Sequence, residues 1–241
     1  MRLLVSVRNE AEALLAAEGG ADFIDLKEPR DGALGGLPIA TVRAIVQALR
    51  ERGIALPVSA TIGDVAMHEA NLIAGRVEAV GACEVDYVKV GIEPSPQAAA
   101  VLGMLARSRH AVVPVFIADA GLDFDLIAHA CQLGFPALMA DTADKRAGSL
   151  FACVAMPELQ RFVATVRQAD KLVGLAGALR LPDLPALRQL APDFAGFRSA
   201  VCVGDRASAL DVQRVRGLAE QLSIGNAAPS ANNSKHASCS A

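Results

Sequence analysis

The chain has 241 residues, enough for one barrel-sized domain or two smaller domains. It is 53% hydrophobic with a formal net charge of −3, which is typical of a soluble globular protein, and it lacks the basic, aromatic-rich patches of nucleic-acid binders. The N-terminal apolar run 3–5 is too short for a signal peptide, and no run could span a membrane, so we expect a cytoplasmic protein without nucleic-acid or membrane partners.

Short β-branched runs alternate with longer segments of helical period along the chain. The predicted strands are 3–7, 22–27, 57–63, 86–92, 112–119, 137–141, 172–179 and 196–202. The predicted helices are 9–18, 39–52, 67–80, 96–109, 124–133, 157–169, 182–190 and 208–222.

Eight such βα units predict one α/β domain, a (β/α)8 TIM barrel, over residues 1–223. A doubly wound sheet is the alternative, and it is weakened because no Gly-x-Gly-x-x-Gly follows the first strand. The remaining segment, 224–241, is small, polar and aperiodic, which predicts a disordered tail.

Lysine is rare in this chain, which has eighteen arginines but only five lysines. Because arginine can replace lysine on a solvated surface, a retained lysine indicates amine chemistry such as imine formation. Lys27, Lys89 and Lys145 lie at or just past the carboxyl ends of the second, fourth and sixth predicted strands. Barrel enzymes carry their active sites at that edge.

Carboxylates accompany these lysines. In "DFIDLK", Asp25 and Lys27 share one face of the strand, and Asp141 ends the sixth strand. We expect these charges to point into the mouth of the barrel, where clustered cations and burial would lower a lysine pKa. The predicted catalytic residues are Lys27, Lys89, Asp25, Asp141 and Lys145. The alternative is an ion-pair layer that only holds the strands together.

Candidate substrate-binding residues follow four other strands. They are Ser59, Thr61, Asp64, Asp119, Gly177, Ala178, Arg198, Ser199 and Ala200. The loops after strands seven and eight are the usual phosphate site of such barrels, although plain glycine turns with an exposed arginine are an alternative. Asp119 fits the N-cap of the following helix as well as it fits catalysis. A phosphate site beside an amine nucleophile describes class I aldolase-type chemistry.

The cysteines and histidines indicate no metal site. The five cysteines (Cys83, Cys131, Cys153, Cys202 and Cys239) form no CxxC pair, and the four histidines are dispersed. We therefore expect free thiols in a reducing compartment.

The stretches "DFIDLKEPRDGALGG", "VSATIGD", "DYVKVG", "DTADKRAGSLF", "LAGAL" and "GFRSAVCVGDR" resemble the (5-formylfuran-3-yl)methyl phosphate synthase family, in that order, over about residues 3–222. The resemblance implies a (β/α)8 barrel that condenses two glyceraldehyde 3-phosphates, with loss of one phosphate and two waters, toward methanofuran-type cofactors of one-carbon metabolism. It implies that Lys27 is the Schiff-base lysine and Lys89 the proton acceptor, with Asp25, Asp141 and Lys145 completing the cluster. It also implies that no metal or organic cofactor takes part, since the imine is the electron sink.

The resemblance weakens in the loop after Lys145, where "RAGSLF" contains no further lysine. Two other functions stay open: another Schiff-base aldolase acting on a sugar phosphate, and a non-catalytic phosphosugar-binding barrel. In each case the expected partner is a small phosphorylated molecule such as a triose phosphate. The sequence leaves the oligomeric state open, a homo-oligomer included.

Overall fold

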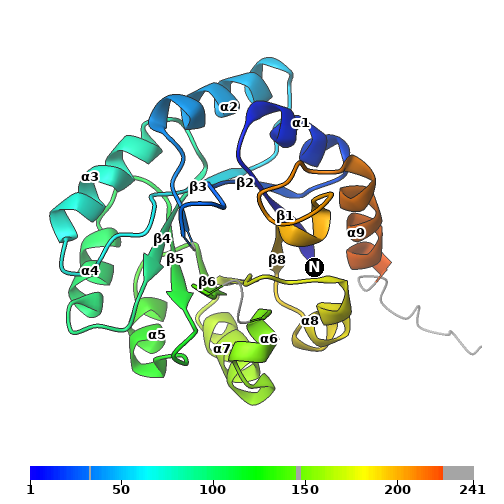
Figure 1. Cartoon of the computed structure of the whole chain (residues 1–241). Helices are drawn as coiled ribbons and strands as arrows, with labels where there is room; N and C mark the ends of the chain where they lie inside the picture. Colours follow the sequence, from blue (N-terminus) through cyan, green and yellow to red (C-terminus); the bar gives the residue numbers. More distant parts are fainter. Residues whose placement is uncertain (33, 145–147, 225–241) are drawn as a thin grey trace, which may run out of the picture.

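The chain folds into a closed barrel of eight parallel strands surrounded by helices (Figure 1). The computed structural model describes residues 1–32, 34–144 and 148–224. Each strand pairs with its neighbours in sequence, and the first strand closes the barrel by pairing with the last, with Arg2 opposite Phe194. This closure confirms the predicted (β/α)8 barrel and excludes the doubly wound sheet, in which the sheet stays open.

The eight strands are short, and each lies within or close to a predicted run. They are β1 (Arg2–Val7), β2 (Phe23–Leu26), β3 (Val58–Thr61), β4 (Tyr87–Ile92), β5 (Val112–Ile117), β6 (Ala137–Asp141), β7 (Leu172–Leu175) and β8 (Phe194–Phe197).

The helices follow the strands and cover the outer face of the barrel (Figure 1). They are α1 (Glu10–Glu18), α2 (Ile39–Glu51), α3 (Ala70–Gly81), α4 (Ala98–Leu105), α5 (Phe124–Cys131), α6 (Leu150–Cys153), α7 (Met156–Gln168), α8 (Leu184–Leu190) and α9 (Val212–Ile224), with 3-10 turns η1 (Leu181–Asp183) and η2 (Ser199–Val201). The sequence did not predict α6 or the two 3-10 turns. The predicted tail lies outside the described residues from residue 225 on.

The eighth strand is the largest difference from the sequence prediction. It was expected over 196–202, but β8 begins at Phe194 and ends at Phe197. Asp193 fixes the start, because its backbone carbonyl accepts from Arg2 of β1 and its side chain accepts from the Val173 backbone of β7. The β-branched "AVC" run then leaves the barrel through η2, where sequence propensity indicated strand.

The seventh strand also ends early, at Leu175 rather than at residue 179. Gly177 and Ala178 have φ values of 115° and 46°, which turn the chain away from the barrel. Only glycine adopts such a conformation without strain, so Gly177 suits this turn better than Ala178 does. The consequence is a tight backbone turn at the carboxyl end of β7.

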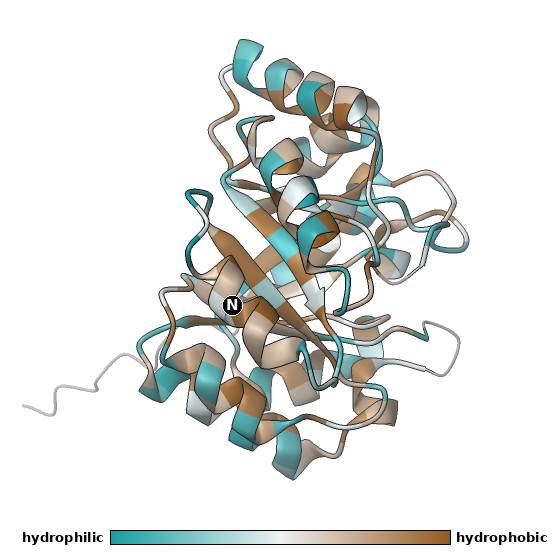
Figure 2. Ribbon diagram, turned by 90° about the vertical axis from the view of Figure 1, so that its left-hand side faces the viewer, coloured by the Kyte–Doolittle hydropathy of each residue, from teal (hydrophilic) through white to brown (hydrophobic). Residues whose placement is uncertain are grey.

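Two apolar layers hold the barrel together. The larger one lies between strands and helices, and the hydrophobic strands seen at the centre of Figure 2 pack against the apolar faces of helices whose polar residues face outward. The smaller one fills the inside of the barrel and includes Leu4, Phe23, Val113, Met139 and Phe194. This inner layer leaves the carboxyl ends of the strands as the place where polar side chains gather inside the barrel.

No helix of the described residues is long and apolar enough to cross a bilayer. Cys83, Cys131 and Cys202 are free thiols, as expected for them.

Candidate active site

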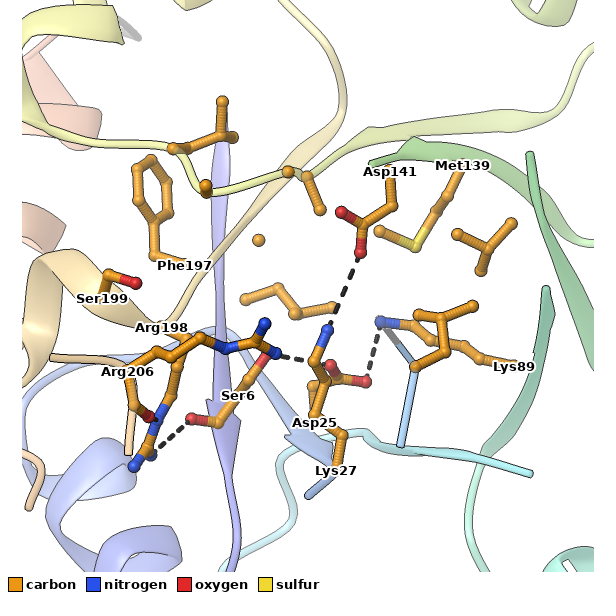
Figure 3. Close-up of a pocket in the computed structure, with 18 residues that line it drawn as sticks. Ser6, Asp25, Lys27, Lys89, Met139, Asp141, Phe197, Arg198, Ser199 and Arg206 are labelled. Atoms are coloured by element: carbon orange, nitrogen blue, oxygen red, sulfur yellow. Dashed lines mark hydrogen bonds and ion pairs between the residues drawn. The ribbon is translucent and has the colours of Figure 1, made fainter. Parts of the chain in front are cut away.

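Asp25 is the centre of a buried polar cluster inside the barrel (Figure 3). Its carboxylate accepts a hydrogen bond from the Lys89 amine at 2.8 Å and one from the Ser59 hydroxyl at 2.6 Å on the same oxygen. Its other oxygen accepts from the Ser6 hydroxyl at 3.0 Å. Four strands, β1 to β4, therefore hold this one carboxylate in place.

Burial and charge shift the pKa values of Asp25 and Lys89. Burial works to raise the pKa of Asp25, but attraction to Lys89 and Lys27 and the hydrogen bonds from Lys89 and Ser59 outweigh it, so the pKa is below its ordinary range. Burial lowers the pKa of Lys89, and repulsion from Lys27 adds to this, while Asp25 and Asp141 partly oppose it. A lysine with a lowered pKa has a larger fraction of neutral amine, the form that can accept a proton.

Lys27 is the first residue after β2, and its amine lies at the mouth of the barrel. It is 3.7 Å from a carboxylate oxygen of Asp141, the last residue of β6, and both side chains are buried. The backbone N–H of Thr142 donates to the other oxygen of Asp141 at 2.8 Å and orients that carboxylate. At 3.7 Å the ammonium contacts Asp141 loosely, which leaves the amine room to react.

Lys89 lies deeper than the sequence indicated. It was expected at the carboxyl end of the fourth strand, but it is the third residue of β4, level with Thr61 of β3. The four-carbon stem carries its amine to the level of Asp25. The structure thus brings together four of the five predicted catalytic residues, Lys27, Lys89, Asp25 and Asp141. The fifth, Lys145, lies outside the described residues.

A pocket opens above this cluster. About 540 Å³ of empty space, its open mouth included, is lined by the two lysines and two carboxylates and by residues from the loops after β7 and β8. Gly177 and Ala178 line one side, and their backbone N–H groups have no acceptor within the described ranges. Successive N–H groups in a turn with positive φ form a concave site for an anion. Ser199 lines the pocket beside them.

Arg198 also lines the pocket, but its guanidinium is fully engaged by the protein. Two of its bonds reach the carboxylate of Glu12 in α1, at 2.5 and 3.1 Å. The others reach the backbone carbonyls of Ser6, Arg206 and Ser208, at 3.1, 2.8 and 2.8 Å. Since a guanidinium has five N–H donors, none is left for a phosphate, which runs against the role expected for Arg198.

Arg206 is a pocket residue that the sequence prediction did not include. In Figure 3 its guanidinium points into the pocket toward Lys27, while that of Arg198 turns away toward the backbone of Ser6. Burial lowers the pKa of Arg206, and attraction from Asp141, Asp64 and Glu28 only partly opposes this. The run "VCVGDR" contains the signal, because it places a second arginine in the loop after β8.

The predicted binding residues in β3 and just after it contact other parts of the protein. Thr61 is buried and donates to the Gly35 carbonyl at 2.9 Å, and Asp64 accepts from the Leu34 backbone at 3.2 Å, so both hold the loop after β2. Ser59 bonds Asp25 and does not line the pocket above it.

The alternative to a catalytic role for Asp119 was the N-cap of the following helix, but its structural role is a different one. Its carboxylate accepts hydrogen bonds from the backbone of Ala143 and Asp144 in the loop after β6. Asp123 is the residue that caps α5. Ala200 packs against the outer apolar layer and does not line the pocket.

Within residues 1–32, 34–144 and 148–224, no three His, Cys, Asp or Glu side chains gather in a way that could hold a metal ion. Among the described residues, the charged groups that line the pocket are the two lysines, the two carboxylates, Arg206 and the engaged Arg198.

The fold and the site define a (β/α)8 barrel enzyme with amines and carboxylates at the carboxyl ends of its strands. Residues 3–219 match the family model described as 4-HFC-P synthase, and the chain belongs to that family. A (5-formylfuran-3-yl)methyl phosphate synthase of Methanopyrus kandleri is 36% identical over 92% of this chain and 98% of its own length. The synthase of the same name from Methanosarcina acetivorans is 32% identical over 93% of this chain and 100% of its own. A protein of Methylorubrum extorquens that carries this name provisionally is 39% identical over 95% of each chain.

Solved structures agree on the fold alone. Phosphoribosyl anthranilate isomerase from Thermus thermophilus superposes with a TM-score of 0.63 at 17% identity, covering 93% of this chain and 99% of its own. Thiamine phosphate pyrophosphorylase from Pyrococcus furiosus gives a TM-score of 0.64 at 15% identity, covering 93% and 96%.

Proposed function

We propose that the protein condenses two molecules of glyceraldehyde 3-phosphate to (5-formylfuran-3-yl)methyl phosphate in the biosynthesis of a methanofuran-type cofactor. Inorganic phosphate and two waters account for the remaining atoms, so the reaction is a lyase-type elimination combined with a condensation. The observation that carries the proposal is the amine of Lys27 at the pocket mouth, with Lys89 of lowered pKa beneath it. The relatives that bear this synthase name support the same reaction.

Lys27 is the nucleophile in this proposal. Its amine forms an imine with the carbonyl group of one triose phosphate, and the resulting iminium makes the neighbouring C–H acidic. Asp141, 3.7 Å from the amine, stabilises the cationic iminium and accepts or returns protons during dehydration.

Lys89 is the proton acceptor. Its amine lies beneath the mouth and is oriented by Asp25, and burial lowers its pKa, which favours the neutral form that accepts a proton. Loss of the proton gives an enamine, which attacks the second triose phosphate and forms the carbon–carbon bond. Elimination of phosphate, ring closure and loss of water then give the aromatic furan.

The enclosed position of the cluster supports amine chemistry over phosphosugar binding alone. Lys27 and Lys89 are 7% and 4% exposed, and binding an anion does not require two amines buried at this depth. Glyceraldehyde 3-phosphate carries both groups that the lining of the pocket would recognise, a carbonyl for the amine and a phosphate for the cationic side.

The test is incubation of the purified protein with glyceraldehyde 3-phosphate as the sole substrate. We expect release of inorganic phosphate, a new near-ultraviolet absorbance from the furan, and a product of the corresponding mass. Formation of a sugar bisphosphate without phosphate release would show another Schiff-base aldolase instead. Reduction with borohydride during turnover should trap a covalent adduct, and peptide mapping should place it on Lys27. An adduct on Lys89 would reverse the roles of the two lysines.

A further inference from the structure

Two arginines lie at the carboxyl end of β8, and they differ in what their guanidinium groups contact. Arg198 is 8% exposed, and all five of its N–H donors have protein acceptors. Its partner Glu12 is equally buried and also accepts from Arg8, so the negative charge opposite Arg198 is fully compensated. Arg198 therefore has a structural role, because its guanidinium links α1, β1 and the loop after β8 and has no donor left over.

Arg206 is half-buried, and its guanidinium is weakly held. Among the residues that the structure describes, its one hydrogen-bond partner is the Gly32 carbonyl, at 3.3 Å. Asp141, Asp64 and Glu28 attract it, but none of them makes an ion pair with it that would consume its donors. Its unused donors can therefore bind an anion that enters the pocket, and such charge-assisted hydrogen bonds are among the strongest in proteins.

The position of Arg206 fits such an anion. Its guanidinium points into the pocket toward Lys27 (Figure 3). The turn at Gly177 and Ala178 lines the same pocket. Arg198 holds the Arg206 loop in place by donating to the carbonyls of Arg206 and Ser208. Both sides of an anion site, a guanidinium and a turn with available N–H groups, therefore face one cavity.

We propose that Arg206, and not Arg198, is the arginine that binds the phosphate group of the substrate, together with the backbone of the Gly177–Ala178 turn. The proposal rests on the proposed function for the identity of the phosphorylated substrate. It gives Arg206 the phosphate-binding role that the sequence prediction gave to Arg198.

The test compares the wild-type protein with Arg206→Ala and with Arg180→Ala. Arg180 is an exposed arginine on the adjacent loop after β7, and it lines the outer rim but not the pocket, which makes it a matched control. Since a hydrogen bond to a charged group contributes about 1.5–3 kcal/mol, Arg206→Ala should raise KM for glyceraldehyde 3-phosphate roughly 10- to 100-fold. The change in kcat should be smaller, and Arg180→Ala should behave as wild type.

A second measurement does not depend on turnover. Inorganic phosphate should raise the Tm of the wild-type protein and of Arg180→Ala, and this rise should be lost in Arg206→Ala. Borohydride trapping with unphosphorylated glyceraldehyde should label Lys27 equally in wild type and Arg206→Ala, because the aldehyde carries no phosphate.

These outcomes separate the two proposals. Wild-type KM and wild-type stabilisation by phosphate in Arg206→Ala would overturn the assignment of Arg206, and so would a wild-type protein whose Tm does not respond to phosphate. A different result is also informative: the wild-type protein makes no furan, yet phosphate stabilises it and does not stabilise Arg206→Ala. That result would support the anion site and overturn the proposed reaction.

Discussion

A lysine inside a barrel is costly unless its charge is compensated or its amine is needed. Lys89 has both a carboxylate at 2.8 Å and a pKa lowered by burial, and Lys27 is held more loosely at 3.7 Å from Asp141. A layer that only joined strands would hold both lysines equally tightly. The difference between the two contacts fits two different tasks, proton transfer for the inner lysine and covalent bonding for the outer one.

Replacing Lys27 by arginine tests the amine chemistry at residue scale. Lys27→Arg keeps the positive charge, but a guanidinium stays protonated and cannot form an imine, so we expect activity to fall by roughly 10³-fold or more in a folded protein. Lys171→Arg is the control, because Lys171 only donates to the carbonyls of Leu133 and Phe135 at the other end of the barrel. Turnover and circular dichroism should be measured on both. Substantial turnover by a folded Lys27→Arg protein would exclude the Schiff base.

The pH dependence of kcat tests the inner lysine. Only neutral Lys89 accepts a proton, so the rate should rise with pH along an acid limb whose midpoint lies below the ordinary lysine value of 10.5. Asp25 attracts the protonated amine and so opposes this lowering. Asp25→Asn removes that attraction, so the pKa of Lys89 should fall further. The midpoint of the acid limb in the pH–rate profile of this variant's residual activity should therefore move to lower pH. A limb that stays in place or moves to higher pH would show that Lys89 is not the titrating group.

At the scale of elements, the loops after β7 and β8 are built by backbone turns rather than by helix or strand propensity. Gly177 has a φ of 115°, and a Cβ there would lie 3.0 Å from the Thr142 hydroxyl and 3.2 Å from the Leu150 Cβ. Its carbonyl also accepts from the Leu150 backbone at the start of α6. The turn thus connects the pocket wall to the loop after β6.

A pair of glycine substitutions tests this turn. Gly177→Ala should lower the free energy of unfolding by about 1–3 kcal/mol, because both the backbone angle and the space oppose a side chain. It should also raise KM for glyceraldehyde 3-phosphate. Gly103→Ala in α4 is the control, since a Cβ there meets no atom within 4 Å, and it should stabilise the helix by roughly 0.5–1 kcal/mol. Denaturant unfolding of both variants gives the comparison. Equal stability of Gly177→Ala and wild type would show that the turn adapts without strain.

The same elements show what could be predicted from the sequence. The period of two along β2 placed Asp25 and Lys27 on one face, and the structure brings both inside the barrel. The start of β8 could not be predicted, because it depends on pairing between Arg2 and residues at 193–194, nearly the whole chain apart. That Arg198 is fully engaged by the protein likewise depends on Glu12, a distant residue whose burial no local pattern indicates.

In the molecule as a whole, the apolar packing of the inner layer offsets the free-energy cost of burying the charged side chains above it. Phe23 and Phe194 contact each other with ring centres 5.5 Å apart, and the guanidinium of Arg2 lies 4.8 Å from the Phe23 ring. This packing fills the inside of the barrel beneath the charged layer. The apolar packing stabilises the barrel, whereas the charged layer contributes little net stability, since burying charges is costly.

A falling pH lowers the stability of the fold through both Asp25 and Lys89, because the pKa of each group is lower in the folded protein than in the unfolded chain. The folded pKa of Asp25 is lowered, so its contribution to stability is present above its unfolded value of 3.8 and is lost as pH falls through the folded value. The folded pKa of Lys89 is also lowered, so stability falls as pH falls from 10.5, where the amine of the unfolded chain takes up its proton first, until the buried amine is protonated as well. Asp25 opposes the lowering of the Lys89 pKa and so reduces this loss of stability.

A double-mutant cycle on Asp25 and Lys89 measures this balance in the unfolding of the whole molecule. Lys89→Met leaves a buried carboxylate without its nearest cation, and Asp25→Asn leaves a buried amine beside Lys27, so each single variant should lose stability, by up to about 3–5 kcal/mol. The double variant should recover much of that loss, because the Asn oxygen can accept from one serine hydroxyl and its amide nitrogen can donate to the other, while Met fills the volume of the lysine stem. Urea unfolding at neutral pH gives the four free energies and their coupling. The two variants that lack Lys89 should be inactive, and Asp25→Asn should keep only residual activity. Losses that simply add would show that the pair is not coupled, and that the lysine tolerates its burial without the carboxylate.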